Sequence, residues 1–206
     1  MSDGPEEVLG FWFSRAPGSD RADVTRQVDW WFRGGADADI VARFPPLLER
    51  AARGELDGWS RMPRSRLALI IVLDQFSRSI HRGTAGAFAQ DAKAVALTLE
   101  GLEVGHYAAL GSHWEKLFFA LPLAHSENLA HLDRVVELME AIIEEGPPEL
   151  RWWLEFSASQ ARGHRDVVRR FGRHPHRNAA LGRQSTPDEL DYLARGEFVH
   201  TRPLPR

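Results

Sequence analysis

The sequence contains no cysteine and almost no lysine: only Lys93 and Lys116 among its 26 basic residues are lysine. The absence of cysteine excludes disulfides, thiolate nucleophiles and cysteine-ligated zinc or iron–sulfur sites. No apolar run is long enough to span a membrane, and MSDGPEEVLGFWF begins with acidic residues and lacks a basic segment. We therefore expect neither a membrane partner nor a secretory signal, and a cytoplasmic location.

What is present is an ordinary globular composition, with 43% apolar and 27% charged residues in 206. Apolar residues recur every three or four positions and strict alternation is scarce, which indicates an all-α protein. We expect a single domain over 1–206, built of stacked antiparallel helix pairs. The predicted helices are 5–13, 24–33, 38–53 (kinked or split at Pro45 and Pro46), 63–81, 84–104 capped by Thr84, 112–122 closed by Pro122, 126–145 capped by Ser126, 148–171 interrupted at Gly163, and a short helix with a capping box at Thr186.

The predicted helix 63–81 changes character halfway along its length. Leu67 to Leu73 is continuously apolar, which predicts burial on all sides. At helical spacing, Asp74, Arg78 and His81 then lie on the face that points inward. Asp74 and Arg78 are four residues apart and could simply neutralise each other within the helix. Alternatively, Asp74 holds Arg78 so that it can bind a carboxylate or phosphate, with His81 and Arg82 completing an anion pocket.

Positive charge is concentrated in residues 161–183, which hold seven arginines and one acid, Asp166. Because the rest of the chain is negative and aromatic residues are not interleaved here, we do not expect nucleic-acid binding. The segment FGRHPHRNAALGR, residues 171–183, has two interpretations. It is a structural turn, in which Gly172 ends a helix and Pro175 fixes a bend, or a stiff loop that holds donors at a cleft mouth. The donors are His174, His176, Arg177 and Asn178.

A third polar segment, LPLAHSENLAH, carries His125, Glu127 and His131, which are all metal-ligand types. It has no specific pattern such as HExxH, so we expect no bound metal. There are two alternatives: His125 forms a hydrogen bond near a helix N-terminus, or His125 and Glu127 form an acid/base pair. No Gly-rich phosphate loop, GxSxG elbow or Walker motif is present, and no cofactor is expected. The seven tryptophans lie mainly on amphipathic helices, as core packing requires.

Four blocks of the sequence together resemble one bacterial family, which is catalogued as domain of unknown function 924. They are GELDGWSRMPRSRLALIIVLDQFSRSIHRGT, AFAQDAKA, LPLAHSENL and FGRHPHRNAALGRQSTPDEL. The resemblance implies an all-helical, tetratricopeptide-like fold and supplies no established reaction. It also implies that His174 replaces a residue that is usually Phe. The matching positions are Asp74, Gln75, Arg78, Arg82, Gly83, Asp91, His125, Glu127, His164, Arg173, Pro175, His176, Arg177, Asn178 and Arg183.

These observations lead to a hypothesis of one polar cleft that binds a small anionic ligand, lined by the Asp74 helix and the C-terminal loop. The expected ligand-binding residues are Asp74, Gln75, Arg78, Arg82, Glu127, Arg173, Arg177, Asn178 and Arg183. If a reaction follows, it is acid/base or hydrolytic chemistry with His81, His125 or His176 transferring protons. The alternative is a non-catalytic, tetratricopeptide-like module that binds a peptide along a groove. The sequence does not identify the substrate or the oligomeric state.

Overall fold

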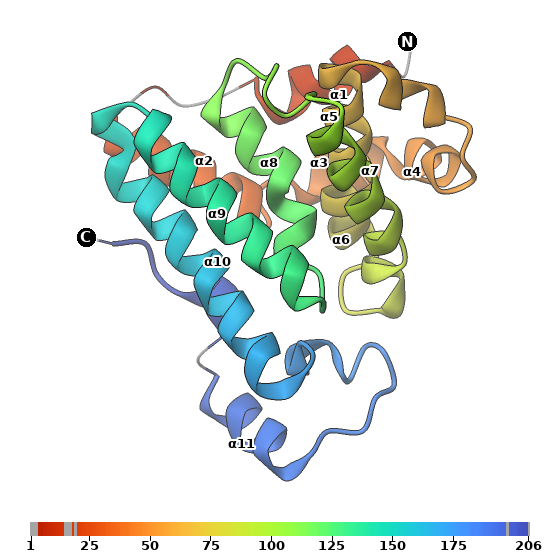
Figure 1. The fold of residues 1–206 in the computed structure, drawn as a ribbon. Coiled ribbons are helices and arrows are strands. Elements are labelled where there is room, and N and C mark those ends of the chain that lie inside the picture. Colours follow the sequence, from red (N-terminus) through yellow and green to blue (C-terminus); the bar gives the residue numbers. More distant parts are fainter. Residues whose placement is uncertain (1–3, 15–17, 19, 197, 206) are drawn as a thin grey trace. The chain divides into compact units, whose positions relative to one another are not determined.

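The computed structural model describes residues 4–14, 18, 20–196 and 198–205, and every regular element within them is helical (Figure 1). This confirms the all-α class. The chain divides into two compact units, Met1–Pro122 and Leu123–Arg206, and the single-domain expectation stays a prediction. Among the helices of the described residues, none combines the length and the apolar character that crossing a membrane requires.

The first unit is a series of short helices, several of which begin at a proline. Pro5, Pro45 and Pro63 occupy the first helical turn of α1, α4 and α5, where a missing amide costs nothing. Pro45 splits the predicted helix 38–53 in two, because Phe44 before it leaves the helical conformation. The elements are α1 Pro5–Trp12, α2 Arg21–Phe32, α3 Asp37–Arg43, α4 Pro45–Ala52, η1 Asp57–Arg61, α5 Pro63–Ile71, η2 Val72–Phe76, α6 Ser77–Ile80, η3 Ala85–Phe88, α7 Asp91–Glu103 and α8 His113–Ala124.

The centre of this unit is α5 and the π-helical turn η2 that continues it. Every side chain from Leu67 to Leu73 is fully buried, as the unbroken apolar run predicts. Helices α1 and α7 pack against α5. The π turn at Val72–Phe76 is wider than an α-helical turn. Residues after it are therefore rotated relative to the positions that a regular helix would give them.

Aromatic side chains fill the rest of this core. Trp12 is 1% exposed, and its ring meets Phe118 edge-on at a centroid distance of 5.3 Å. Trp31 packs on Phe118 at 4.9 Å and donates from Nε1 to the backbone oxygen of Trp12 at 2.9 Å. Packing of the rings explains the burial of both tryptophans, and the indole N–H of Trp31 is paired, whereas the buried Nε1 of Trp12 has no hydrogen-bond partner among the described residues.

The second unit is built on one antiparallel helix pair. Helices α9 and α10 lie side by side (Figure 1). Its elements are α9 Leu129–Glu145, η4 Pro148–Leu150, α10 Arg151–Phe171, η5 Pro175–Arg177, α11 Pro187–Arg195 and η6 Val199–Thr201. The predicted interruption at Gly163 is wrong, because α10 runs through it. A Cβ on Gly163 would lie 3.0 Å from Val199, so the glycine allows the C-terminal segment to approach α10 closely.

Three predicted helix ends also differ from the structure. Thr84 precedes the 3-10 turn η3, and Gln90 precedes α7. Asn128 caps α9 by accepting from the backbone of Ala130 at 2.9 Å, whereas Ser126 lies two residues earlier. Helix α8 continues past Pro122 to Ala124. The predicted capping box at Thr186 is confirmed at the start of α11.

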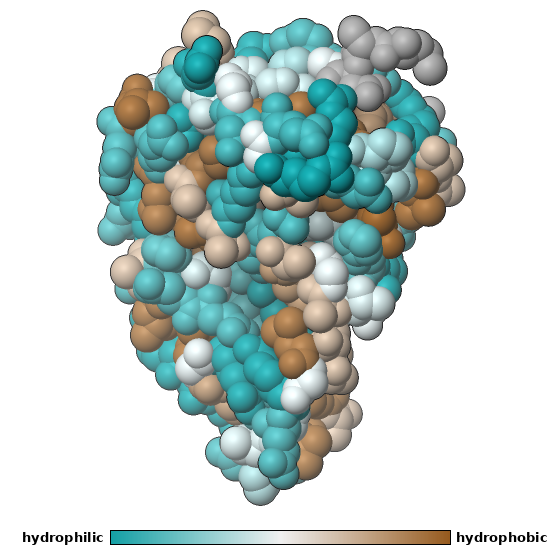
Figure 2. All heavy atoms as spheres, turned by 90° about the vertical axis from the view of Figure 1, so that its right-hand side faces the viewer, coloured by the Kyte–Doolittle hydropathy of each residue, from teal (hydrophilic) through white to brown (hydrophobic). Residues whose placement is uncertain are grey.

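The surface holds no broad apolar area on the face shown in Figure 2, where apolar side chains are interspersed with polar ones. Large apolar side chains that are exposed occur singly on different elements, for example Met62 between η1 and α5 and Leu190 on α11. Scattered exposure of this kind is normal for globular proteins.

Candidate functional site

The first polar cluster surrounds Arg78 on α6. Its Nη2 donates to Asp74 at 3.1 Å and to Asp91 at 2.9 Å, and its Nη1 contacts the backbone oxygen of Ala87 at 3.4 Å. Asp74 is 1% exposed and the Arg78 side chain is 21% exposed. Burial disfavours the charge, but the two carboxylates outweigh it and raise the pKa of Arg78. The intrahelical pair is therefore formed, and two carboxylates face one guanidinium, which disfavours an added anion.

The other predicted members of this site differ: Gln75 joins the cluster, whereas Arg82 and His81 do not. Gln75 donates to the second oxygen of Asp74 at 2.5 Å, whereas Arg82 is exposed and pairs with Asp37 at 2.5 Å. The expectation that His81 faces inward is wrong, because its side chain is exposed. Helix α6 ends at Ile80, so His81 is its C-cap residue with non-helical backbone angles and does not continue the face of Asp74 and Arg78.

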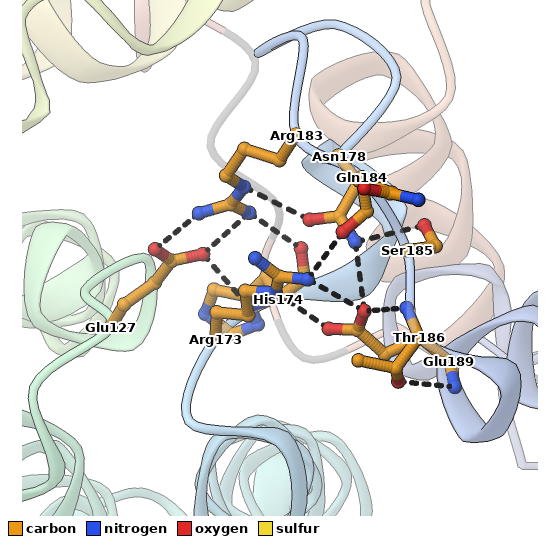
Figure 3. A network of polar contacts seen from close by, with 9 residues as sticks. All are labelled: Glu127, Arg173, His174, Asn178, Arg183, Gln184, Ser185, Thr186 and Glu189. Carbon is orange, nitrogen blue, oxygen red and sulfur yellow. Dashed lines mark hydrogen bonds and ion pairs between the residues drawn. The ribbon is translucent and has the colours of Figure 1, made fainter.

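The second polar cluster orders the loop after α10 (Figure 3). Gly172 ends α10 in the left-handed conformation, with φ of 72°, as the turn interpretation predicts. Arg173 then bridges both oxygens of Glu189 at 2.6 and 2.7 Å. Asn178 and the backbone of Thr186 donate to the same carboxylate. The hydrogen bond from Arg173 is the largest cause that lowers the pKa of Glu189 to about 2, so this carboxylate is ionised and fully engaged.

A second carboxylate clamps the same loop from the other side. Glu127 accepts from both Nη atoms of Arg183 at 2.8 and 3.0 Å and from the backbone amide of His174 at 2.8 Å. Arg183 also donates to the backbone oxygen of His174 and to Asn178 (Figure 3). Burial would raise the pKa of Glu127, but these donors lower it. Glu127, Arg173, Asn178 and Arg183 thus bind one another, and they hold the loop that carries His174 in one position.

The third cluster consists of histidines, and the loop just described supports it. We call His125, His164, His174, His176 and His200 the imidazole cluster. The ring of His174 lies between those of His164 and His176, with centroid distances of 5.5 and 5.4 Å. His176 lies 4.7 Å from His200. Helix α10, the segment around η5 and the C-terminal turn η6 each supply at least one ring.

Burial disfavours the charged form of the imidazoles at the centre of the cluster. It is the largest cause that lowers the pKa of His174 and His176 to about 2 and that of His164 well below its ordinary value. The positive charge of Arg177, which is 6% exposed, lowers the pKa further at each of the three and at His200. A proton on His125 would act on all four in the same direction. His164, His174 and His176 are therefore neutral rings beside the buried Arg177.

Of these residues, His125, His176 and Arg177 belong to the predicted site, and His174 is among the donors predicted for the loop, whereas His164 and His200 are not among the predicted site residues. The spacing HPH in residues 174–176 was the available sequence signal for His174. Nothing in the sequence places His164 or His200 beside it, because folding of the C-terminal segment brings them together.

The metal alternative with His125, Glu127 and His131 is not formed. Glu127 is engaged by Arg183, and Nδ1 of His131 is bonded to Ser126 Oγ at 2.9 Å. In the described part of the chain, no three His, Asp or Glu side chains are grouped so that they could hold a metal ion. The hypothesis that the Asp74 helix and the C-terminal loop share one cleft stays a prediction.

Comparison with known proteins gives the family of the chain. No curated protein matches it significantly. A solved structure, that of a protein of unknown function from Agrobacterium tumefaciens, is similar to it with 36% sequence identity and a TM-score of 0.77, covering 93% of this chain and 97% of the other. The model of the bacterial family of unknown function DUF924 matches residues 8–197. The chain therefore belongs to the DUF924 family.

Proposed function

We propose that the C-terminal unit binds a small anionic ligand at the imidazole cluster, with Arg177 as the fixed positive charge. The observation that supports this most is that the buried Arg177 lies in η5 together with His176 and next to His174, and the rings of these two histidines lie 5.4 Å apart. A guanidinium held among neutral imidazoles is a combination of side chains that recognises oxyanions.

The residues offer the donors that an oxyanion requires. Arg presents a planar fork that fits carboxylate and phosphate, and a neutral imidazole has one N–H donor in addition to one lone pair. His200 is exposed and His176 is half-buried, so these two rings mark the side from which a ligand enters. Arg173 and Arg183 are committed to carboxylates, which leaves them the role of holding the loop.

If the bound ligand reacts, the proposed chemistry is acid/base or hydrolytic, with His125 and His176 as the proton-transfer groups. The pKa of His176 is about 2, so this ring would accept a proton only when a bound anion raises that pKa. Arg177 would stabilise the negative charge that develops. His81 is not part of this proposal, since it is exposed and lies in the first unit.

Isothermal titration calorimetry with inorganic phosphate tests the proposal. We expect saturable binding to the wild type, and a loss of about 10- to 100-fold in affinity in Arg177→Gln, as removal of a charge-assisted hydrogen bond implies. Arg170→Gln is the matched control, because Arg170 is exposed on the same unit and its guanidinium lies over the ring of Phe171. Equal losses of phosphate affinity in both variants would show that only the net charge of the protein matters, and would contradict a specific role of Arg177.

Because Arg177 is buried, its replacement can also impair folding. His200→Asn is the second variant, since His200 is exposed, and we expect it to weaken phosphate binding while circular dichroism stays unchanged. Absence of binding to the wild type at millimolar phosphate would refute the proposal.

A further inference from the structure

We propose that His106 is a pH-sensitive switch: its neutral ring holds the loop between α7 and α8, residues 104–112, against α5, and its protonated ring releases that loop. Every group that forms the switch lies in the first unit. The switch is therefore independent of the proposed anion site in the second unit, and the two can fail separately.

The backbone brings His106 back to the last turn of α7 directly after that helix ends. Gly105 adopts the left-handed conformation, with φ of 79°. The amide of His106 then donates to the backbone oxygen of Gly101 at 2.8 Å, and the amide of Gly105 donates to that of Leu102 at 3.3 Å. These two bonds form the Schellman arrangement of a helix C-terminus. The amide of His106 therefore reports whether the loop is attached to α7.

The guanidinium of Arg66 on α5 binds the ring of His106. Arg66 is 2% exposed, and its Nε donates to Nδ1 of His106 at 3.1 Å and to the backbone oxygen of Ser60 at 3.0 Å. Its Nη1 donates to the backbone oxygen of Leu97 at 2.9 Å and to Glu100 at 3.1 Å. One buried cation thus joins η1, α5, α7 and the loop that follows α7.

Only the neutral ring of His106 can make this bond. A guanidinium donates and never accepts, so Nδ1 of His106 is the acceptor and the neutral ring carries its hydrogen on Nε2. A protonated imidazole carries a hydrogen on both nitrogens, so it has no lone pair for Arg66. It also places a second positive charge beside the guanidinium. Protonation therefore turns an attractive contact into a repulsive one.

The surroundings of the attached ring favour its neutral form. Burial lowers the pKa of His106 most, and the positive charge of Arg66 lowers it further. The carboxylate of Glu100 raises this pKa by a smaller amount, and it is 58% exposed, where water screens its charge. On α8, Lys116 adds a positive charge beside the loop, with Nζ 5.7 Å from the centroid of the Tyr107 ring. The net result is a pKa of His106 below its ordinary value.

Acidification therefore favours the released loop. The ring of a released loop titrates near its ordinary pKa of about 6.5, whereas the pKa of the attached ring is lower. Above about pH 6.5 neither form binds a proton and the loop stays attached. As the pH falls below that value, the released form binds a proton that the attached form does not, so its population rises until the pH reaches the lower pKa.

Hydrogen exchange of the His106 amide, corrected for the intrinsic rate at each pH, measures this release. Between about pH 7.5 and 5.5 we expect the opening constant of that amide to rise by about three- to tenfold, as one titrating histidine implies. The amide of Phe44, which donates to the backbone oxygen of Ile40 at 3.0 Å in the same unit, should keep its opening constant. In His106→Asn the rise should be absent, because the side-chain oxygen accepts from Arg66 at every pH.

A second variant tests the charges around the ring. Glu100→Gln removes the carboxylate that raises the pKa of His106, and Glu100 is exposed enough for the protein to tolerate the change. NMR titration of His106 should give a pKa below about 6.5 in the wild type and a lower pKa in Glu100→Gln.

Three results would overturn the switch. The first is a wild-type His106 that titrates at or above about pH 6.5, or a Glu100→Gln variant in which its pKa does not fall. The second is a rise of the opening constant in His106→Asn as large as in the wild type, because another group would then cause the opening. The third is an equal rise at the Phe44 amide, which would show unfolding of the whole unit in place of release of one loop.

Discussion

Acidification should destabilise the second unit through its buried imidazoles. A histidine in an unfolded chain titrates near its ordinary value of about 6.5, whereas the pKa of His174 in the folded unit is about 2, with burial as the main cause. Below about pH 6.5 the unfolded state therefore binds more protons than the folded state. Stability is complete above that pH and is lost as the pH falls toward 2.

The size of the effect follows from this shift. Each pH unit below the unfolded pKa costs about 1.4 kcal/mol per fully buried imidazole. Between about pH 7.5 and 5.5, His174 alone should reduce the free energy of unfolding by roughly 1.3 kcal/mol. His176, which is half-buried and shifted in the same direction, adds a smaller amount. Glu189 does not contribute in this range, because Arg173 holds its pKa at about 2, so its loss begins only below about pH 4.5.

Hydrogen exchange of the slowest amides in α10 measures this free energy for the second unit, after correction for the intrinsic exchange rate at each pH. The control is His174→Phe, in which the pH-dependent loss should be smaller than in the wild type by roughly 1.3 kcal/mol. A wild type and variant with the same loss, within a few tenths of a kcal/mol, would show that His174 is not held neutral by burial.

Three further outcomes are expected. Asp74→Ala should lower the free energy of unfolding, measured by chemical denaturation, by about 2–4 kcal/mol; the loss is smaller than for a completely broken buried pair because Asp91 still binds Arg78. Arg82→Ala should lower it by less than about 1 kcal/mol, as is usual for an exposed ion pair. Equal losses in the two variants would contradict the buried position of Asp74. Gly10→Ala should raise the free energy of unfolding by about 0.5–1 kcal/mol, because a Cβ at position 10 contacts no other atom. Gly163→Ala should not raise it, and equal gains in the two variants would contradict the close contact between Gly163 and Val199. Chelator should leave the melting temperature unchanged, and one equivalent of bound metal by elemental analysis would overturn that expectation.

Local chemistry made much of the fold predictable. Apolar periodicity placed the buried run at Leu67–Leu73, and the capping box at Thr186 placed the start of α11. Gly163 was interpreted wrongly, because its role depends on Val199, which is distant in sequence. The π turn at Val72–Phe76 also escaped prediction, since nothing in the pattern of apolar and polar residues distinguishes it from an α-helical turn.

The site was predictable only in part, for a related reason. Residue types identified the loop with His176 and Arg177, but they could not show that Arg183 is already paired with Glu127, 56 positions away. Nor could they separate His174 from its neighbours. Its distinguishing property is the bond of Nε2 to Ser126, which exists only in the folded unit.

The central claim is that an anion binds at the imidazole cluster, and nitrogen NMR of the histidine side chains during a phosphate titration tests it most directly. We expect the ring resonances of His174, His176 and His200 to shift saturably, with one common dissociation constant. Those of His81 and His106, which lie in the first unit, should not move. Shifts of all nine histidines in proportion to ionic strength, or a cluster that does not respond, would contradict the claim.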